Sequence, residues 1–146
     1  MTKCESRLSE KRVKHYLELA KNACIYSDSE RTRVGCVVVY KGKVLSVGWN
    51  NEKTSPTQKK YNRYRGFDPD ISGTVNSIHA ELHAISKIKD MDINWSKVYV
   101  FVYRIKKDDT KGMARPCPGC EKMLRDMGVR RVYYSTNNGY AYEVYD

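Results

Sequence analysis

Two short motifs constrain the fold and the chemistry of this chain more than any other feature. The first reads His-Ala-Glu and begins at His79, and the second reads Pro-Cys-Pro-Gly-Cys and ends at Cys120. A catalytic zinc takes three protein ligands and leaves a fourth position for water, and the side chains of His79, Cys117 and Cys120 can supply the three. Glu81 lies close to His79 in the chain, so we expect its carboxylate to stand near the metal without binding it and to carry protons.

Each motif alone has a structural alternative. A Cys-x-x-Cys pair could be a redox pair or half of a zinc ribbon, and a lone helical histidine is more often packed or exposed than a ligand. The main alternative for the combined motifs is a closed structural zinc site, with His83 or another cysteine as fourth ligand, because His79 and His83 would share a helical face. Glu81 favours the catalytic interpretation, since a purely structural site has no use for it.

In chain order, His-x-Glu followed by Pro-Cys-x-x-Cys is the signature of zinc-dependent nucleobase deaminases. The chain therefore resembles the cytidine deaminase superfamily, from about Arg33 to about Tyr134. Residues 78–84, Ile-His-Ala-Glu-Leu-His-Ala, resemble its deoxycytidylate branch, which commonly has Asn at the position of His83. The resemblance implies a hydrolase acting on the C–N bond of a cyclic amidine. With one zinc per chain, it would convert a cytosine nucleotide or nucleoside to the uracil product and ammonia.

The resemblance also implies which residues contact the substrate. The backbone N–H of Ala80 would point at the base carbonyl, and Asn50, at the end of the second strand, would hydrogen-bond a ribose hydroxyl. Val34, on the first strand, and Pro116 complete the expected contacts. The alternative for Asn50 is a turn-forming role, because Asn51 follows it and asparagine favours turns.

Length and composition favour a single deaminase domain that spans residues 1–146. A hydrophobic content of 40% and a charged content of 30% suit a soluble globular chain with its own core. No apolar run approaches membrane-spanning length and the N-terminal residues are polar, so we expect no membrane contact and a cytoplasmic location. Cys4, Cys24 and Cys36 have no regular spacing, so we expect no disulfide framework, with Cys24 and Cys36 packed as small hydrophobic residues.

The spacing of apolar residues predicts alternating helices and strands. The expected helices cover 9–27, a segment opened by His79, capped by Asn76 or Ser77 and ending near 89–90, and 117–127, ended by Gly128. The expected strands cover a hairpin at 33–50, then 98–105, 129–135 and 140–145. A short turn at 137–139 requires the last two strands to be antiparallel. With the resemblance, this predicts a three-layer α/β/α cytidine-deaminase-like fold. Its mixed sheet has five strands, and both zinc-bearing helices lie side by side on one face.

Residues 51–74 form the longest segment without a predicted element. The segment interleaves aromatic and basic residues, which could clamp one nucleotide or hold a single strand by stacking and phosphate contacts. It contains neither Cys nor His, so we expect no second zinc. A polar insertion at residues 106–115 separates the third strand from the second motif, where relatives have almost none, and Arg115 replaces the Ser or Glu usual there.

The formal net charge of +10 favours anionic partners but does not choose between a mononucleotide and a polymer. The first hypothesis is a deaminase of deoxycytidylate or a related nucleotide or nucleoside. The alternatives are a cytosine or adenine editor of single-stranded DNA or RNA and, less favoured, a zinc module without catalytic activity. The antiparallel final strand pair favours the small substrate, since in this superfamily it is typical of free nucleoside deaminases. The sequence leaves the formation of a homo-oligomer open.

Overall fold

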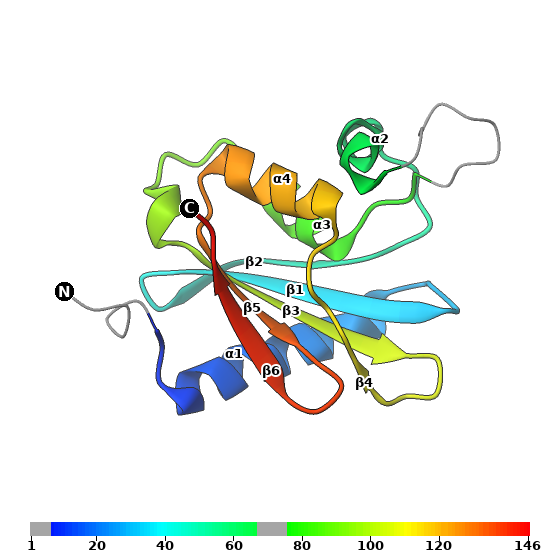
Figure 1. Ribbon diagram of the computed structural model, residues 1–146, viewed down its shortest axis with the longest axis horizontal. Helices are drawn as coiled ribbons and strands as arrows, with labels where there is room; N and C mark the ends of the chain where they lie inside the picture. The colour runs from blue at the N-terminus through cyan, green and yellow to red at the C-terminus, as the bar shows by residue number, and fades with distance from the viewer. Residues whose placement is uncertain (1–6, 67–75) are drawn as a thin grey trace.

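A mixed sheet forms the centre of the structure, a computed structural model that describes residues 7–66 and 76–146. The strands run in the order β2-β1-β3-β5-β6, and the short β4 pairs with β3 (Figure 1). Strands β3 and β5 are parallel, whereas the other pairs in this order are antiparallel, including the predicted final pair. The strands are β1 (Thr32–Tyr40), β2 (Lys43–Trp49), β3 (Tyr99–Lys106), β4 (Lys111–Gly112), β5 (Arg131–Ser135) and β6 (Tyr140–Val144).

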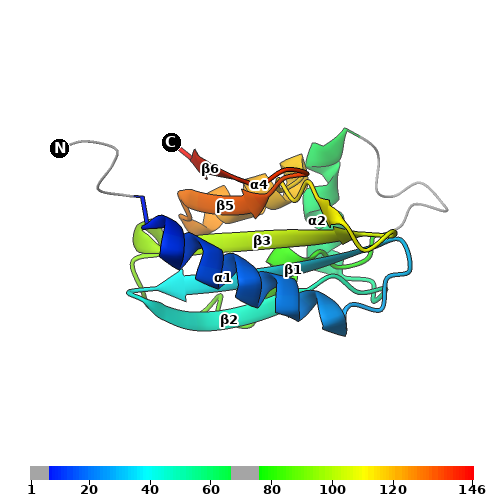
Figure 2. The same ribbon diagram turned by 90° about the horizontal axis from the view of Figure 1, so that it is seen from below.

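Helices cover both faces of this sheet. Helix α1 lies across one face, and α2, α3 and α4 lie on the other (Figures 1 and 2). The helices are α1 (Glu10–Ala23), α2 (Pro56–Asn62), α3 (Ala80–Ser86) and α4 (Pro118–Met127), with short 3-10 turns η2 (Cys24–Tyr26), η3 (Arg63–Arg65) and η4 (Trp95–Lys97). This arrangement confirms the predicted three layers, with the two motif-bearing helices, α3 and α4, in contact on one face.

Strand β3 separates two cores because its side chains alternate between the faces of the sheet. Val100 and Val102 pack in the core beneath α3 and α4. Phe101 packs with Tyr133 in the core beneath α1. Both faces of the strand are buried, which explains why its sequence is almost continuously apolar.

Helix α1 agrees with its sequence signals. The Ser9 hydroxyl accepts a hydrogen bond from the N–H of Arg12 at 3.2 Å and so caps the first turn. The helix ends in the 3-10 turn η2 instead of continuing as α-helix through the predicted end. Cys24 and Cys36 are fully buried and form no disulfide, as expected for small hydrophobic residues.

The segment predicted as a loop at 51–74 is partly helical, which corrects the sequence interpretation. The Ser55 hydroxyl accepts a hydrogen bond from the N–H of Gln58 at 3.2 Å. Pro56 occupies the first turn, where a backbone N–H would have no partner within the helix, so the N–H that proline lacks is not needed there. Ser followed three residues later by Gln is a helix-start signal that sequence reasoning missed. Residues 67–74 of the predicted loop lie outside the described residues.

Two further expectations need correction. Helix α3 begins at Ala80 with His79 in the N-cap position and ends at Ser86, so the predicted caps and the predicted end near 89–90 are wrong. The polar insertion folds back on itself through a hydrogen bond from the N–H of Lys106 to the carbonyl of Thr110 at 2.8 Å. Its residues then add β4 to the five strands that were predicted.

In the described part of the chain, no helix has both the length and the apolar character needed to span a membrane.

Candidate active site

The two motifs meet where α3 and α4 begin. His79 is the N-cap residue of α3, Cys117 is the N-cap residue of α4, and Cys120 lies in the first turn of α4. The His79 Nδ1 atom lies 3.6 Å from the Cys117 sulfur and 3.3 Å from the Cys120 sulfur. Zinc bond lengths at tetrahedral angles place nitrogen and sulfur ligands about 3.6 Å apart. The three side chains therefore fit around one zinc ion, as predicted.

The local chain geometry holds both sulfurs in place. The Cys117 sulfur accepts a hydrogen bond from the N–H of Cys120 at 3.5 Å, which is the capping interaction of α4. Hydrogen bonds from Cys120 and His79 hold the pKa of the Cys117 thiol at about 4. The bond to Cys117 and burial together raise the pKa of the Cys120 thiol well above its usual value. Cys117 is thus a thiolate at neutral pH, the form in which cysteine binds metals.

Glu81 lies beside this group in the first turn of α3. Its side chain is only 5% exposed. Burial raises the pKa of this carboxyl to about 7, although the neighbouring His79 acts in the opposite direction. A carboxyl group with a pKa near neutrality can both accept and donate a proton at physiological pH, as a proton carrier must.

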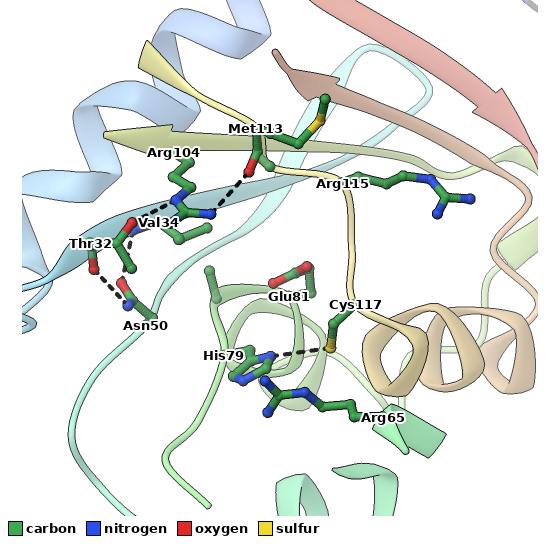
Figure 3. Close-up of a pocket in the computed structure, with 12 residues that line it drawn as sticks. Thr32, Val34, Asn50, Arg65, His79, Glu81, Arg104, Met113, Arg115 and Cys117 are labelled. Atoms are coloured by element: carbon green, nitrogen blue, oxygen red, sulfur yellow. Dashed lines mark hydrogen bonds between the residues drawn. The ribbon is translucent and has the colours of Figure 1, made fainter. Parts of the chain in front are cut away.

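Glu81 and His79 line a cavity of about 260 Å³ between the start of β1, the end of β2 and the segment before α4 (Figure 3). Three of the four predicted substrate contacts also line it: Val34, Asn50 and Ala80. The fourth, Pro116, is buried next to Cys117 in the chain but is not among the lining residues. The structure therefore brings the predicted catalytic and metal residues together with most of the predicted substrate contacts.

Asn50 joins β1 to the end of β2 through its side chain. Its Oδ1 atom accepts hydrogen bonds from the Val34 N–H at 2.8 Å and the Ser27 hydroxyl at 2.7 Å. Its Nδ2 atom donates to the carbonyl of Thr32 at 3.0 Å. These bonds use both acceptor lone pairs and one of the two amide hydrogens. Asn50 thus has a structural role that links distant segments, different from the turn-forming role considered from the sequence, and one amide hydrogen is left over.

His83 stabilises the end of β2 and is not part of the metal group. Its Nδ1 atom accepts a hydrogen bond from the N–H of Trp49 at 3.1 Å, and the two rings meet edge to face at 4.6 Å. Burial lowers the pKa of His83, and nearby Lys87 lowers it further, so the ring is a neutral acceptor at physiological pH. Among the described residues, only His79, Cys117 and Cys120 approach closely enough to share a metal. This geometry does not support His83 as a fourth ligand.

Two arginines also line the cavity: Arg65, from the basic segment predicted to contact a ligand, and Arg104, which was missed from the sequence. Arg65 extends toward His79 from η3, and Arg104 lies near Asn50 (Figure 3). Arg104 donates to the hydroxyl of Thr32 at 2.8 Å and to the carbonyl of Met113 at 3.5 Å. A charged residue near the end of an otherwise apolar central strand was the signal that could have identified Arg104.

Arg115 lines the mouth of the cavity but is engaged elsewhere. Its side chain is directed away from Glu81 (Figure 3) and forms an ion pair with Glu143 of β6. A second carboxylate, that of Glu121, lies 3.8 Å from the same guanidinium. The unusual residue before the second motif therefore connects the mouth of the cavity to the last strand.

A series of buried side-chain hydrogen bonds fixes the backbone of His79, and this too was missed from the sequence. The Gln58 side-chain oxygen accepts a hydrogen bond from the backbone N–H of His79 at 2.9 Å. Gln58 donates in turn to Asn62 at 3.0 Å, and Asn62 donates to Asn76 at 2.9 Å. Gln58 and Asn62 are 1% and 0% exposed. Helix α2 is therefore tied directly to the start of α3.

Helix α2 also packs closely on α4. A Cβ atom at Gly119 would lie 2.6 Å from the carbonyl oxygen of Tyr61, so only glycine fits there. The Tyr61 hydroxyl donates to Asp126 at 3.0 Å. Part of the aromatic and basic segment expected to meet a ligand is thus used in packing against the second motif helix.

Comparison with known proteins shows the family to which these motifs belong. Residues 10–136 match the family model described as the cytidine and deoxycytidylate deaminase zinc-binding region. The chain is 28% identical over 128 residues to a probable deoxycytidylate deaminase of Caenorhabditis elegans, covering 87% of this chain and 58% of the relative. It is 26% identical over 128 residues to the deoxycytidylate deaminase of Mycobacterium phage D29, covering 82% and 91%. The chain spans about half the length of the animal relatives it matches.

Solved structures are similar over most of the chain. The dCMP deaminase from the cyanophage S-TIM5, solved in complex with dCMP and dUMP, has a TM-score of 0.60 at 25% identity, with 88% of this chain and 83% of that chain covered. The cytidine deaminase from Burkholderia pseudomallei has a TM-score of 0.60 at 16% identity, with 94% and 93% covered. The second similarity concerns the fold alone.

Proposed function

The chain belongs to the cytidine and deoxycytidylate deaminase zinc-binding family, and from this premise we propose that it hydrolytically deaminates a cytosine nucleotide of the deoxycytidylate kind. The observation that carries the proposal is the buried Glu81 carboxyl, which lines one cavity with His79 and Cys117, the two residues that form a metal-ligand group with Cys120. The similarity to a dCMP deaminase solved with its nucleotides supports a nucleotide substrate. The cytoplasmic location and the single-domain organisation stay predictions from the sequence.

The proposed mechanism assigns the proton transfers to Glu81. His79, Cys117 and Cys120 would hold the zinc ion, which would supply a Lewis acid that lowers the pKa of water. The Glu81 carboxylate accepts a proton from the water whose oxygen bonds the ring carbon, and delivers it to the neighbouring ring nitrogen. Glu81 then carries the second proton, from the new hydroxyl group on that carbon, to the amino group, whose C–N bond breaks as ammonia leaves. The near-neutral pKa of Glu81 suits this exchange of roles.

Other lining residues would orient the base and the sugar. The N–H of Ala80 belongs to the first residue of α3, where backbone N–H groups have no partner within the helix, and is proposed to donate to the base carbonyl. The remaining amide hydrogen of Asn50 is proposed to donate to a sugar hydroxyl. Val34 and Pro116 are proposed to complete the base pocket.

The two arginines are proposed to select a nucleotide over a nucleoside. Arg104 uses two of its five N–H donors on Thr32 and Met113, and this anchoring limits the positions its guanidinium can take. Arginine presents its donors in a planar fork that matches a phosphate group. Arg104, with Arg65 on the other side of the cavity, is therefore the proposed partner of the substrate phosphate.

A substrate panel tests this function directly. The zinc-loaded protein is incubated separately with deoxycytidylate, deoxycytidine and a single-stranded oligonucleotide that contains cytosine, and the products are analysed by mass spectrometry. We expect efficient conversion of deoxycytidylate to the uracil nucleotide and weaker conversion of the nucleoside. Conversion confined to the oligonucleotide would replace the proposal with the polymer-editing alternative. If no substrate is converted, the result would favour a zinc-binding domain without catalytic activity.

A further inference from the structure

A second cavity, of about 340 Å³, lies at the opposite end of the sheet from the candidate active site. Its walls come from the start of α1, the turn between β1 and β2, and the first residues of β3 and β5. Figures 1 and 2 both place these segments at one end of the molecule. Thr32 lines the active-site cavity and Lys41, just past the other end of β1, lines this one. A strand of that length separates them by about 30 Å.

The lining of this second cavity is basic. Four of its residues carry positive charge and none carries negative charge: Arg12, Lys41, Lys97 and Arg131. In the described part of the chain, none of the four forms an ion pair. Elsewhere on the surface, basic side chains do find carboxylates, as Lys122 does with Asp126 at 2.7 Å. Like charges gathered without a counter-charge repel one another and attract an anion.

Two contacts hold the walls of the cavity in place. The hydroxyl of the buried Tyr16 donates to the carbonyl of Gly42 at 3.2 Å, which joins α1 to the β1–β2 turn. Tyr99 and Arg131 are register partners on adjacent parallel strands. The Arg131 guanidinium lies 5.3 Å from the centre of the Tyr99 ring, a contact that orients its N–H groups. These contacts fix the backbone of the cavity walls and the orientation of Arg131 before any ligand binds.

We infer that this cavity is a second binding site, for a small anion that bears a phosphate group. Arg12, Lys97 and Arg131 reach it from three different elements, so one anion can be contacted from several sides. Charged donors make the strongest hydrogen bonds to phosphate oxygens, and arginine can do so with two parallel bonds. The volume lies within the roughly 300–1,000 Å³ of small-molecule sites. This inference is independent of the deaminase proposal, because none of these residues lines the active-site cavity.

The test is a titration of the isotope-labelled, zinc-loaded full chain with inorganic phosphate, followed by the NMR shifts of backbone amides. We expect saturable shifts at Arg12, Gly42 and Lys97, and no such shifts with chloride at equal ionic strength. Arg131→Gln and the exposed Lys97→Gln should each weaken phosphate binding about ten- to hundredfold, the loss typical of one charge-assisted hydrogen bond.

Lys21→Gln is the matched control, because Lys21 is an exposed cation near the other end of α1. It removes the same charge and should leave phosphate binding unchanged. The inference is overturned if chloride produces the same shifts, if the shifts do not saturate, or if Lys21→Gln weakens binding as much as Lys97→Gln. Shifts confined to residues around Arg104 would place phosphate in the active site alone and would also overturn it.

Discussion

At the scale of single residues, Glu81 can be substituted to remove its proton transfer without removing a metal ligand or a helix cap. Glu81→Gln keeps the size of the side chain and removes its ability to accept a proton. We expect turnover to fall by about 10²–10⁴, the usual contribution of a positioned acid–base group. Zinc content, measured by elemental analysis, should stay at one ion per chain because Glu81 is not among the three metal-binding residues.

Cys117→Ala is the contrasting variant. It removes a metal ligand and the cap of α4 together, so zinc content and thermal stability should fall with activity. If Glu81→Gln lost zinc as Cys117→Ala does, the assignment of Glu81 as a proton carrier would be wrong.

Arg104 permits a test of substrate choice at the same scale. Arg104→Gln should raise the KM for deoxycytidylate about ten- to hundredfold through the loss of one charge-assisted contact. The kinetics of deoxycytidine should change little, because that substrate has no phosphate. Lys106→Gln, on the same strand but outside the cavity lining, is the control. An equal loss on nucleotide and nucleoside would show that Arg104 only holds Thr32 and Met113 in place.

At the scale of elements, the main relation is between α2 and the metal-bearing end of α3. The side-chain oxygen of Gln58 accepts a hydrogen bond from the N–H of His79, and its side-chain nitrogen donates one to Asn62. Gln58→Leu would leave that N–H without its partner, so we expect zinc affinity to fall about ten- to hundredfold, as for other groups that orient metal ligands. Competition with a chromophoric chelator measures this affinity without relying on activity.

Gln58→Glu separates positioning from general destabilisation. Its carboxylate can still accept the His79 N–H but cannot donate to Asn62, so zinc affinity should be higher than in Gln58→Leu. Thr57→Leu, an exposed change in the same helix, should leave zinc affinity unchanged. Equal zinc affinity in Gln58→Leu and the native chain would contradict the positioning role.

The same scale shows what could be read from the sequence. The five main strands and the presence of the two motif helices were predictable, because local patterns such as Gly128 after α4 and the turn at 137–139 specify them, whereas β4 was not predicted. Helix α2 also had a local signal, Ser55 with Gln58, but its surroundings are polar and gave no apolar periodicity. Arg104 had a local signal too, its charge near the end of an apolar strand, but its position beside the cavity depends on pairing between β1 and β3, distant segments of the chain.

At the scale of the whole molecule, stability in acid depends on contacts between the cavity mouth and β6. The hydrogen bonds from Arg115 and Tyr134 lower the pKa of Glu143. A lowered folded-state pKa stabilises the fold above the unfolded-state value, about 4.3, and this stabilisation is lost as pH falls through the folded-state pKa. Glu143→Gln should therefore be destabilising at neutral pH, by no more than about 1 kcal/mol for a partly exposed pair. The difference should vanish in acid.

Denaturant unfolding across the acid range measures this dependence. Asp90→Asn, at an exposed carboxylate without an ion pair among the described residues, should show no comparable convergence with the native chain. A constant difference between Glu143→Gln and the native chain at every pH would rule out the charge of Glu143 as its cause.

The parallel pairing of β3 with β5 has a consequence for the order of assembly. A parallel pair needs a crossover connection, and here that connection contains α4 with both cysteines. The sulfurs reach His79 only once the chain has crossed back over the sheet. Parallel pairing closes a long loop and is slow for that reason. During refolding, capture of the metal by all three side chains should therefore follow formation of the β3–β5 crossover, which would make zinc a late addition to the fold.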